Sequence, residues 1–412
     1  MNRSAPSSDS VCSSESSLPT KIALYIHIPF CQTKCPYCDF NTYAGIEPLM
    51  PNYIKALTTE ILHWGALLGK PEIRTIFFGG GTPSYVPVQS IETILRAAQT
   101  AFHVSSDAEI TMEANPGDLM SERATSLRKL GINRLSIGTQ SLDDSLLKVL
   151  GRRHSSQEAV DAYGAVRMAG FDNISLDLMY GLPSQTIHQW RDSLKKVLSL
   201  SPEHLSLYCL TLEEGTPMHQ QMRLGEMSEP DPDLAADMYL LAENLLEQAG
   251  YDHYEISNWA KPGMESLHNL TYWHNQPYIG VGPGAHSYLG MWRFNNINSP
   301  REYIRRFSNV ATPSTSLDVL SSDVISQVPT VDNVEIIEHS MEMAETMMLG
   351  LRLSEGISLE HFANRFGRSL DSVYGEQIQE LISLKLLEQR NRALYLTDRG
   401  RLLGNEVFLR FF

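Results

Sequence analysis

Short β-rich segments alternate with longer helical segments from residue 21 to about residue 212, and this alternation constrains the fold more than any other feature. Repeated βα units predict a parallel sheet with helices outside it. Six units are too few for a complete eight-stranded barrel, so we predict an α/β fold built on a partial (β/α)6 TIM-like barrel. The expected strands cover residues 22–28, 75–78, 109–114, 134–139, 174–179 and 205–210, and the expected helices cover 52–68, 89–102, 121–130, 157–168 and 186–198.

The polar side chains of these strands share one face. A strand alternates its faces with period two, so Glu109, Thr111 and Glu113 point to the same side of the third strand. Ser175 and Asp177 do so in the fifth strand. The interior of an ordinary barrel is filled with Val, Ile and Leu. A polar interior therefore predicts a cavity for a polar ligand, and the alternative is a hydrogen-bonded polar layer without a ligand.

The rest of the chain divides by composition into further parts. We predict a disordered Ser-rich tail over residues 1–20, the partial barrel over 21–255, a central extension rich in aromatic residues and His with a linker over 256–334, and a C-terminal domain over 335–412. The C-terminal domain is expected to hold three helices and then a hairpin near 386–397, an arrangement typical of winged-helix-like domains.

The formal net charge of −15 disfavours some classes of partner. A nucleic-acid surface must be basic, and docking on anionic lipid also needs basic residues. We find neither an apolar stretch of the roughly 20 residues that span a membrane nor the pattern of a signal peptide. We therefore expect a cytoplasmic protein that binds no nucleic acid.

Three of the five cysteines lie within eight positions, at Cys31, Cys35 and Cys38, directly after the first expected strand. An odd, clustered set is a poor disulfide framework and indicates a metal or cofactor site in a reducing compartment. Three thiolates on one loop can hold a four-iron cluster and leave one iron open for another ligand. The alternative is a tetrahedral zinc site, for which His27 is the nearest fourth ligand.

The Cys-x3-Cys-x2-Cys spacing after a strand resembles the signature of the radical S-adenosylmethionine superfamily. The longer string Tyr-Ile-His-Ile-Pro-Phe-Cys, from Tyr25 to Cys31, is similar to the oxygen-independent coproporphyrinogen dehydrogenase group. This resemblance covers essentially the whole chain after the tail. It implies a radical S-adenosylmethionine barrel, a [4Fe-4S] cluster on the three cysteines and S-adenosylmethionine chelated by the open iron.

The resemblance also implies which residues surround S-adenosylmethionine. In the family a glycine run, here residues 79–81, contacts the methionine amino group, and other motif positions lie around the nucleoside, the carboxylate and the cluster. The matching cofactor-binding positions are Tyr25, Tyr37, Gly80, Gly81, Thr82, Glu113, Gln140, Arg152 and Asp177. They largely coincide with the polar strand faces described above.

One position departs from the pattern of true coproporphyrinogen dehydrogenases. Those enzymes carry a fourth cysteine two places after the third, where this chain has Phe40. The departure resembles the HemW branch, whose members act as haem chaperones and deliver haem to respiratory enzymes. His268-Asn-Leu-Thr-Tyr272-Trp273 matches a His-Asn-x-x-Tyr-Trp string of that branch. The resemblance implies haem as a third cofactor, apo haem proteins of the respiratory chain as partners, membrane contact only through these clients, and a possible homodimer.

A haem carrier needs an axial donor that can exchange and a flat apolar surface. His268, with Tyr272 and Trp273, supplies both. Rival donors are His253, His274 and His286. Four methionines at helical spacing are expected in the core rather than on haem: Met341, Met343, Met347 and Met348.

The alternative function is enzymatic: an oxygen-independent coproporphyrinogen III dehydrogenase, or another radical reaction on a tetrapyrrole. Arg152 or Arg153 would then hold a propionate side chain. A more distant alternative is a cluster with a purely structural role.

Overall fold

All six expected strands are present, and each runs parallel to its neighbour in one sheet. They are β2 (Lys21–Ile28), β5 (Glu72–Gly80), β6 (His103–Ala114), β7 (Arg134–Gln140), β8 (Ile174–Tyr180) and β9 (His204–Cys209). The computed structural model describes residues 16–308, 310 and 319–412, so most of the expected tail over 1–20 lies outside the described residues. The predicted α/β fold with a partial (β/α)6 barrel is confirmed.

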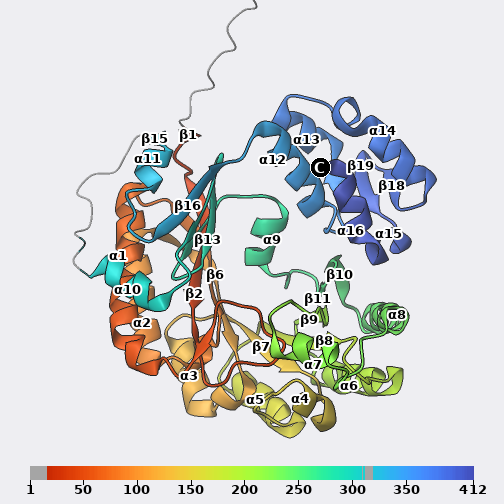
Figure 1. Cartoon of the computed structure of the whole chain (residues 1–412), viewed down its shortest axis with the longest axis horizontal. Helices are drawn as coiled ribbons and strands as arrows, with labels where there is room; N and C mark the ends of the chain where they lie inside the picture. The colour runs from red at the N-terminus through yellow and green to blue at the C-terminus, as the bar shows by residue number, and fades with distance from the viewer. Residues whose placement is uncertain (1–15, 309, 311–318) are drawn as a thin grey trace, which may run out of the picture.

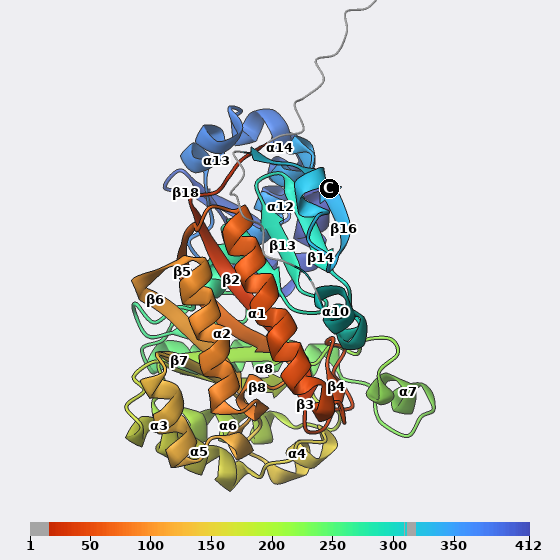
Figure 2. The ribbon, with the colours of Figure 1, turned by 90° about the vertical axis from the view of Figure 1, so that its left-hand side faces the viewer.

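Helices cover the outer face of this sheet (Figure 1). The five expected ones are α1 (Met50–Leu67), α2 (Val88–Ala101), α3 (Ser121–Lys129), α5 (Ser156–Met168) and α6 (Ile187–Leu200), joined by α4 (Asp144–Val149) and α8 (Pro232–Gln248). Figure 2 shows α1 and α2 side by side in front of the strands. Capping boxes start α5 at Ser155 and α6 at Thr186, because each hydroxyl accepts the N3 amide while the N3 side chain accepts from the cap.

The main apolar core lies between the sheet and the helices. Leu24, Ile26 and Leu135 are fully buried on the outward face of their strands, and Trp64 of α1 and Ile91 of α2 are fully buried in the same cluster. Because side chains alternate along a strand, the intervening polar residues face the barrel interior. The predicted polar interior is confirmed.

The sheet continues beyond the expected barrel on both edges, through strands that the sequence pattern did not predict. At one edge β10 (Asp252–Glu255) and β11 (Asn258–Ala260) add antiparallel strands to β9. At the other, β12 (Tyr278–Val281) pairs parallel with β2, followed by antiparallel β13 (His286–Leu289), β14 (Trp292–Asn296) and β16 (Val331–Ile336). The twelve strands run in the order β10-β11-β9-β8-β7-β6-β5-β2-β12-β13-β14-β16. The central extension thus shares the sheet of the barrel.

The C-terminal region has the expected three helices and hairpin, with its own apolar core. The elements are α12 (His339–Gly350), β17 (Ile357–Ser358), α13 (Leu359–Phe366), α14 (Leu370–Ser383), β18 (Leu387–Arg390), β19 (Ala393–Leu396), α15 (Asp398–Leu402) and α16 (Gly404–Phe408). As predicted, Met343 and Met347 are buried in this core and Met348 packs against it, but the prediction is wrong for Met341, which is exposed near the start of α12. The boundaries between the four predicted segments stay a prediction.

A short helix, α9 (Leu267–Trp273), lies between the barrel and the C-terminal region (Figure 1). Arg365 donates hydrogen bonds to the carbonyl oxygens of His274 and Asn275, just after this helix. The remaining short elements are β1 (Ser16–Ser17), β3 (Phe30–Cys31), β4 (Tyr43–Ala44), α7 (Pro217–Arg223), α10 (Pro300–Phe307), β15 (Val319–Leu320) and α11 (Ser322–Ile325). No helix in the described ranges has both the length and the apolar character needed to cross a membrane.

Candidate functional site

The three clustered cysteines lie on the loop that follows β2. Cys31 ends β3 and is buried, whereas Cys35 and Cys38 are partly exposed, and all three are free thiols. The Cys38 amide donates to the Cys35 carbonyl oxygen at 3.1 Å, which closes a turn between them. Pairing of β3 with β4 holds the rest of the loop. The spacing of the cysteines therefore corresponds to one compact loop with three sulfurs.

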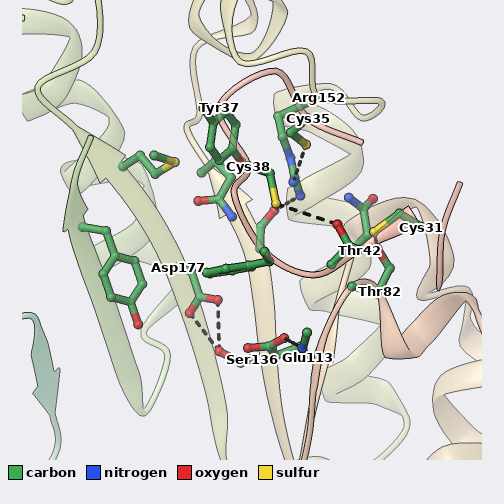
Figure 3. Close-up of a pocket in the computed structure, with 18 of the residues that line it drawn as sticks. Cys31, Cys35, Tyr37, Cys38, Thr42, Thr82, Glu113, Ser136, Arg152 and Asp177 are labelled. Carbon is green, nitrogen blue, oxygen red and sulfur yellow. Dashed lines mark hydrogen bonds between the residues drawn. The ribbon is translucent and has the colours of Figure 1, made fainter. Parts of the chain in front are cut away.

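Each thiol has a polar neighbour (Figure 3). The Thr82 hydroxyl donates to Cys31 Sγ at 3.5 Å, and Arg152 Nη1 donates to Cys35 Sγ at 3.5 Å. Cys38 Sγ lies 3.9 Å from the Thr42 hydroxyl. Burial raises the pKa of the Cys31 and Cys38 thiols, and the threonine hydrogen bonds oppose this rise. Such donors stabilise the thiolate, which is the form that binds metal.

These sulfurs open into a cavity of ≈ 550 Å³ inside the barrel. Its walls carry almost all of the residues that the motifs indicated, at or near the carboxyl ends of the strands, where barrel chemistry gathers. They are Tyr37, Gly80, Gly81, Thr82, Glu113, Gln140, Arg152 and Asp177. Tyr25 is the exception: it lines a second cavity of ≈ 330 Å³. The two cavities share Phe40, Gly80 and Glu113 as walls.

Two partly buried carboxyl groups, those of Glu113 and Asp177, interact electrostatically inside the main cavity (Figure 3). The Gly80 amide donates to Glu113 Oε2 at 3.1 Å, and the Ser136 hydroxyl donates to Asp177 at 2.8 Å. Burial raises the pKa of Glu113 to about 8, the Asp177 carboxylate adds to the rise, and the Gly80 hydrogen bond opposes it. Burial also raises the pKa of Asp177. Glu113 therefore exchanges its proton near neutral pH.

Gly80 has a backbone conformation that only glycine adopts easily, with φ of +105°. A β-carbon there would lie 2.5 Å from Cε1 of the His27 ring. The His27 ring is buried, with Nδ1 3.0 Å from the Tyr25 hydroxyl and Nε2 3.0 Å from the Asn41 carbonyl oxygen. Both ring nitrogens are thus engaged, so His27 is not a free fourth ligand for a zinc ion.

The described residues contain no group of three or more His, Cys, Asp or Glu side chains gathered around a point suited to a single metal ion. The fit to the expected group depends instead on the donor set and its surroundings. Three free thiols share one loop, and the cavity wall beside them holds a buried Arg152 Nε without a hydrogen-bond partner. These residues fit an iron–sulfur cluster with a polar ligand next to it.

His268 is not the accessible haem donor that we expected. Its side chain is fully buried, with Nδ1 2.8 Å from the Thr75 hydroxyl and Nε2 2.9 Å from the Tyr272 hydroxyl. Its ring stacks on Phe77 with centroids 5.0 Å apart. Burial, with the nearby Arg134, lowers the pKa of His268 to about 3. Ligation of haem by His268 would require these contacts to break.

The companion aromatic residues of that motif are also packed. Tyr272 meets Tyr278 edge to face at 4.6 Å, and the Arg352 guanidinium lies 4.4 Å from the Trp273 ring centroid. Tyr272 and Tyr278 line the second cavity, but Trp273 lines neither cavity described here.

Among the rival histidines, His274 and His286 are both exposed, but only His286 lines one of the two cavities. His253 stacks on Trp259 at 4.2 Å, and His274 Nε2 lies 2.8 Å from Glu355 Oε1. His286 lines the second cavity, and no hydrogen bond joins its ring to another residue of the described chain. Burial lowers the pKa of the His286 imidazole, which keeps it neutral and able to act as a ligand.

Several lining residues were missed by sequence reasoning, among them Arg134, Ser206, Asn269 and Cys209. Arg134 lies two positions before Ser136 and therefore on the same face of β7, so the alternation of faces, extended to the start of the strand, would have identified it. Asn269 reaches the cavity from α9, and no local pattern indicates that this helix borders the barrel interior.

Comparisons with known proteins identify the family of this chain. Residues 25–197 match the Radical SAM superfamily, and residues 337–403 match the HemN C-terminal domain. The Heme chaperone HemW of Bacillus subtilis is 39% identical over 385 residues, 93% of this chain and 97% of that protein. Heme chaperone HemW of Mycobacterium tuberculosis is 33% identical over 389 residues, 93% of each chain. The structure of coproporphyrinogen III oxidase (HemN) from Escherichia coli superposes with a TM-score of 0.80 at 22% identity, over 95% of this chain and 90% of that one.

The structural likeness concerns the fold alone, because the two sequences are only 22% identical. The sequence relatives carry the assignment further, since they match this chain from the barrel to the C-terminal region. The chain therefore belongs to the HemW family within the radical S-adenosylmethionine superfamily.

Proposed function

We propose that this protein is a haem chaperone that holds a [4Fe-4S] cluster and S-adenosylmethionine in its barrel, binds haem beside the central aromatic segment and delivers it to apo haem proteins of the respiratory chain. The observation that carries the proposal is that three free thiols line the polar cavity of the barrel. Phe40 stands where a fourth cysteine marks the coproporphyrinogen dehydrogenases, and the curated relatives quoted above are named haem chaperones.

The cluster would be held by Cys31, Cys35 and Cys38. Three protein ligands leave one iron open, and a reduced cluster of this kind supplies an electron for cleavage of S-adenosylmethionine. The remaining residues bind and orient. The missing side chain of Gly80 leaves room for the His27 ring behind the cavity wall, and Arg152, a partly buried positive charge beside Cys35, suits a carboxylate.

For haem, the second cavity offers the better donor. It combines the exposed His286 imidazole with the rings of Tyr272 and Tyr278. An axial donor that exchanges haem with clients must be reachable, and His268 is not. We therefore assign the axial role to His286 and a packing role to His268.

The test begins with anaerobic reconstitution, in which iron and sulfide are counted and haem is titrated by its Soret band. We expect about four irons and four sulfides per chain, and a Cys38→Ser variant that loses most of them. His286→Ala should weaken haem binding more than His268→Ala does, and His188→Ala, an exposed histidine on α6, serves as the control. One zinc without sulfide, or equal haem binding by all three variants, would contradict the assignment.

The enzymatic alternative is tested on the same material. Arg153, one of its two candidate propionate clamps, already pairs with Asp118 at 2.6 Å and donates to Gln32. Anaerobic incubation of the reconstituted protein with coproporphyrinogen should give no decarboxylated product. Turnover would overturn the carrier proposal in favour of a dehydrogenase.

A further inference from the structure

Arg134 is a buried positive charge on the wall of the main cavity. It is the first residue of β7, and its side chain is only 2% exposed. Gln140 ends the same strand six residues later, about 20 Å further along at the usual rise per residue. Arg134 therefore lines the end of the cavity remote from the cysteine loop.

The Arg134 guanidinium has no partner within the described ranges of the chain. No ion pair or hydrogen bond joins it to another described residue, and its Nε is buried without an acceptor. The Asp177 carboxylate is near enough for the charge of Arg134 to oppose the rise of its pKa, but no hydrogen bond or ion pair joins the two side chains. Asp177 accepts from Ser136 and Ser175, and Glu109 accepts from the first two backbone amides of α9 at 3.1 Å each. A buried guanidinium without a hydrogen-bonded partner is costly, so this position favours a further anion from outside the chain.

Among the described lining residues the other cations are Lys34, Arg152 and Arg153, which lie at the cysteine end of the cavity. His204 and His268 lie close to Arg134, and burial, reinforced by its charge, lowers the pKa of both, so they are neutral. Asn269 of α9 also lines the cavity, and no hydrogen bond joins its carboxamide to another side chain in the described residues. A guanidinium beside a free amide is a good match for a carboxylate, because both donate to its oxygens.

We propose that Arg134 and Asn269 form a carboxylate-binding subsite that takes a propionate of the bound tetrapyrrole, an assignment that rests on the proposed function. Helix α9 supports this choice, since it presents Asn269 to the main cavity and Tyr272 to the second one. A tetrapyrrole seated against this helix contacts both. The carboxylate of S-adenosylmethionine is the other source of the same chemistry, but Arg152, beside the cysteines, is already available for it.

The test pairs each acid with an analogue that lacks the carboxylate. Reconstituted wild-type protein, Arg134→Gln and Arg134→Lys are titrated anaerobically with haem and haem dimethyl ester, and with S-adenosylmethionine and its decarboxylated analogue. Arg128→Gln, an arginine of α3 outside both cavities, is the matched control. The comparison of haem with its dimethyl ester on the wild-type protein tests the subsite even if the variants do not fold.

We expect Arg134→Gln to weaken haem binding at least about tenfold and to bind haem and its ester equally well, whereas the wild-type protein prefers haem by a similar factor. Arg134→Lys should lie between them, because a lysine keeps the charge but not the forked geometry. The same pattern with S-adenosylmethionine alone would support the subsite with that ligand as its source. If Arg134→Gln keeps the wild-type preference for the acid in both pairs of ligands, the subsite is overturned. If the wild-type protein takes up no haem, the proposed function is refuted, and the S-adenosylmethionine pair still tests Arg134.

Discussion

The Glu113→Gln substitution should remove a pH dependence from the binding of S-adenosylmethionine. Glu113 lies in the main cavity, hydrogen-bonded to the amide of Gly80 in the glycine run that contacts the methionine amino group in the family. An ionised carboxylate accepts hydrogen bonds from that amino group with both oxygens, whereas a protonated carboxyl loses part of its acceptor capacity. Binding therefore favours the deprotonated form of Glu113, and affinity should rise with pH through the pKa of this group.

The size of the effect follows from the pKa of about 8, which burial and Asp177 raise from the ordinary value of 4.5. At pH 7 about one tenth of Glu113 is ionised, and at pH 9 about nine tenths. Apparent affinity scales with the fraction of the competent form, so it should increase about tenfold between these values, or about 1.4 kcal/mol. Above about pH 9 the curve should level off.

The assay is equilibrium binding of S-adenosylmethionine to the anaerobically reconstituted protein between pH 6.5 and pH 9.5. Glu113→Gln has no titrating group, so its affinity should stay flat over that range. Glu122→Gln, an exposed glutamate in the first turn of α3, should behave like the wild-type protein. Equal wild-type affinity at pH 7 and pH 9, or the same rise in the glutamine variant, would refute the role given to Glu113.

Three further predictions concern stability. Gly80→Ala should lower the free energy of unfolding by about 2 kcal/mol or more, because the added β-carbon combines a positive φ with a clash. Gly170→Ala has a positive φ but no atom within 4 Å of its added β-carbon, so it should lower the free energy of unfolding by only about 1 kcal/mol. Equal urea midpoints for the two variants would contradict this difference. Burial raises the pKa of Glu60 to about 7, so its folded form binds a proton that the unfolded chain releases, and wild-type stability should fall by about 3 kcal/mol relative to Glu60→Gln as pH rises from 4.5 to 7. Urea unfolding at several pH values measures that difference, and a constant gap between the two proteins speaks against it. Thr75→Val leaves Nδ1 of buried His268 without its hydroxyl partner and should cost about 1–3 kcal/mol in thermal unfolding, an effect whose absence would mean that the bond contributes nothing.

Local patterns in the sequence were enough for the barrel and for most of the cofactor side of the site. The period-two alternation follows from backbone geometry alone, so it located the interior faces that carry Glu113 and Asp177. Cys31, Cys35 and Cys38 lie on one short loop, so their spacing alone brought them together. These features depend on residues that are close together in the sequence, so contacts with distant segments do not change them.

Such local patterns did not predict the strands of the central extension. Strands β12, β13 and β14 are four or five residues long, too short to show an alternation, and β12 becomes a strand by pairing with β2, more than 250 residues earlier. A sequence window contains no information on such a partner, because the free energy of pairing comes from hydrogen bonds and packing with it.

The haem side of the site was decided in the same way. His268 and Tyr272 are one helical turn apart, which the sequence makes plain, but the hydroxyl that occupies the other nitrogen of His268 belongs to Thr75, 193 residues away. The sequence alone determined which side chains are available for chemistry and how each strand or loop presents them. Only the tertiary structure decided which are buried, which are paired and which, like Arg134 and His286, are left facing a cavity, because burial and pairing depend on segments that meet only when the chain folds.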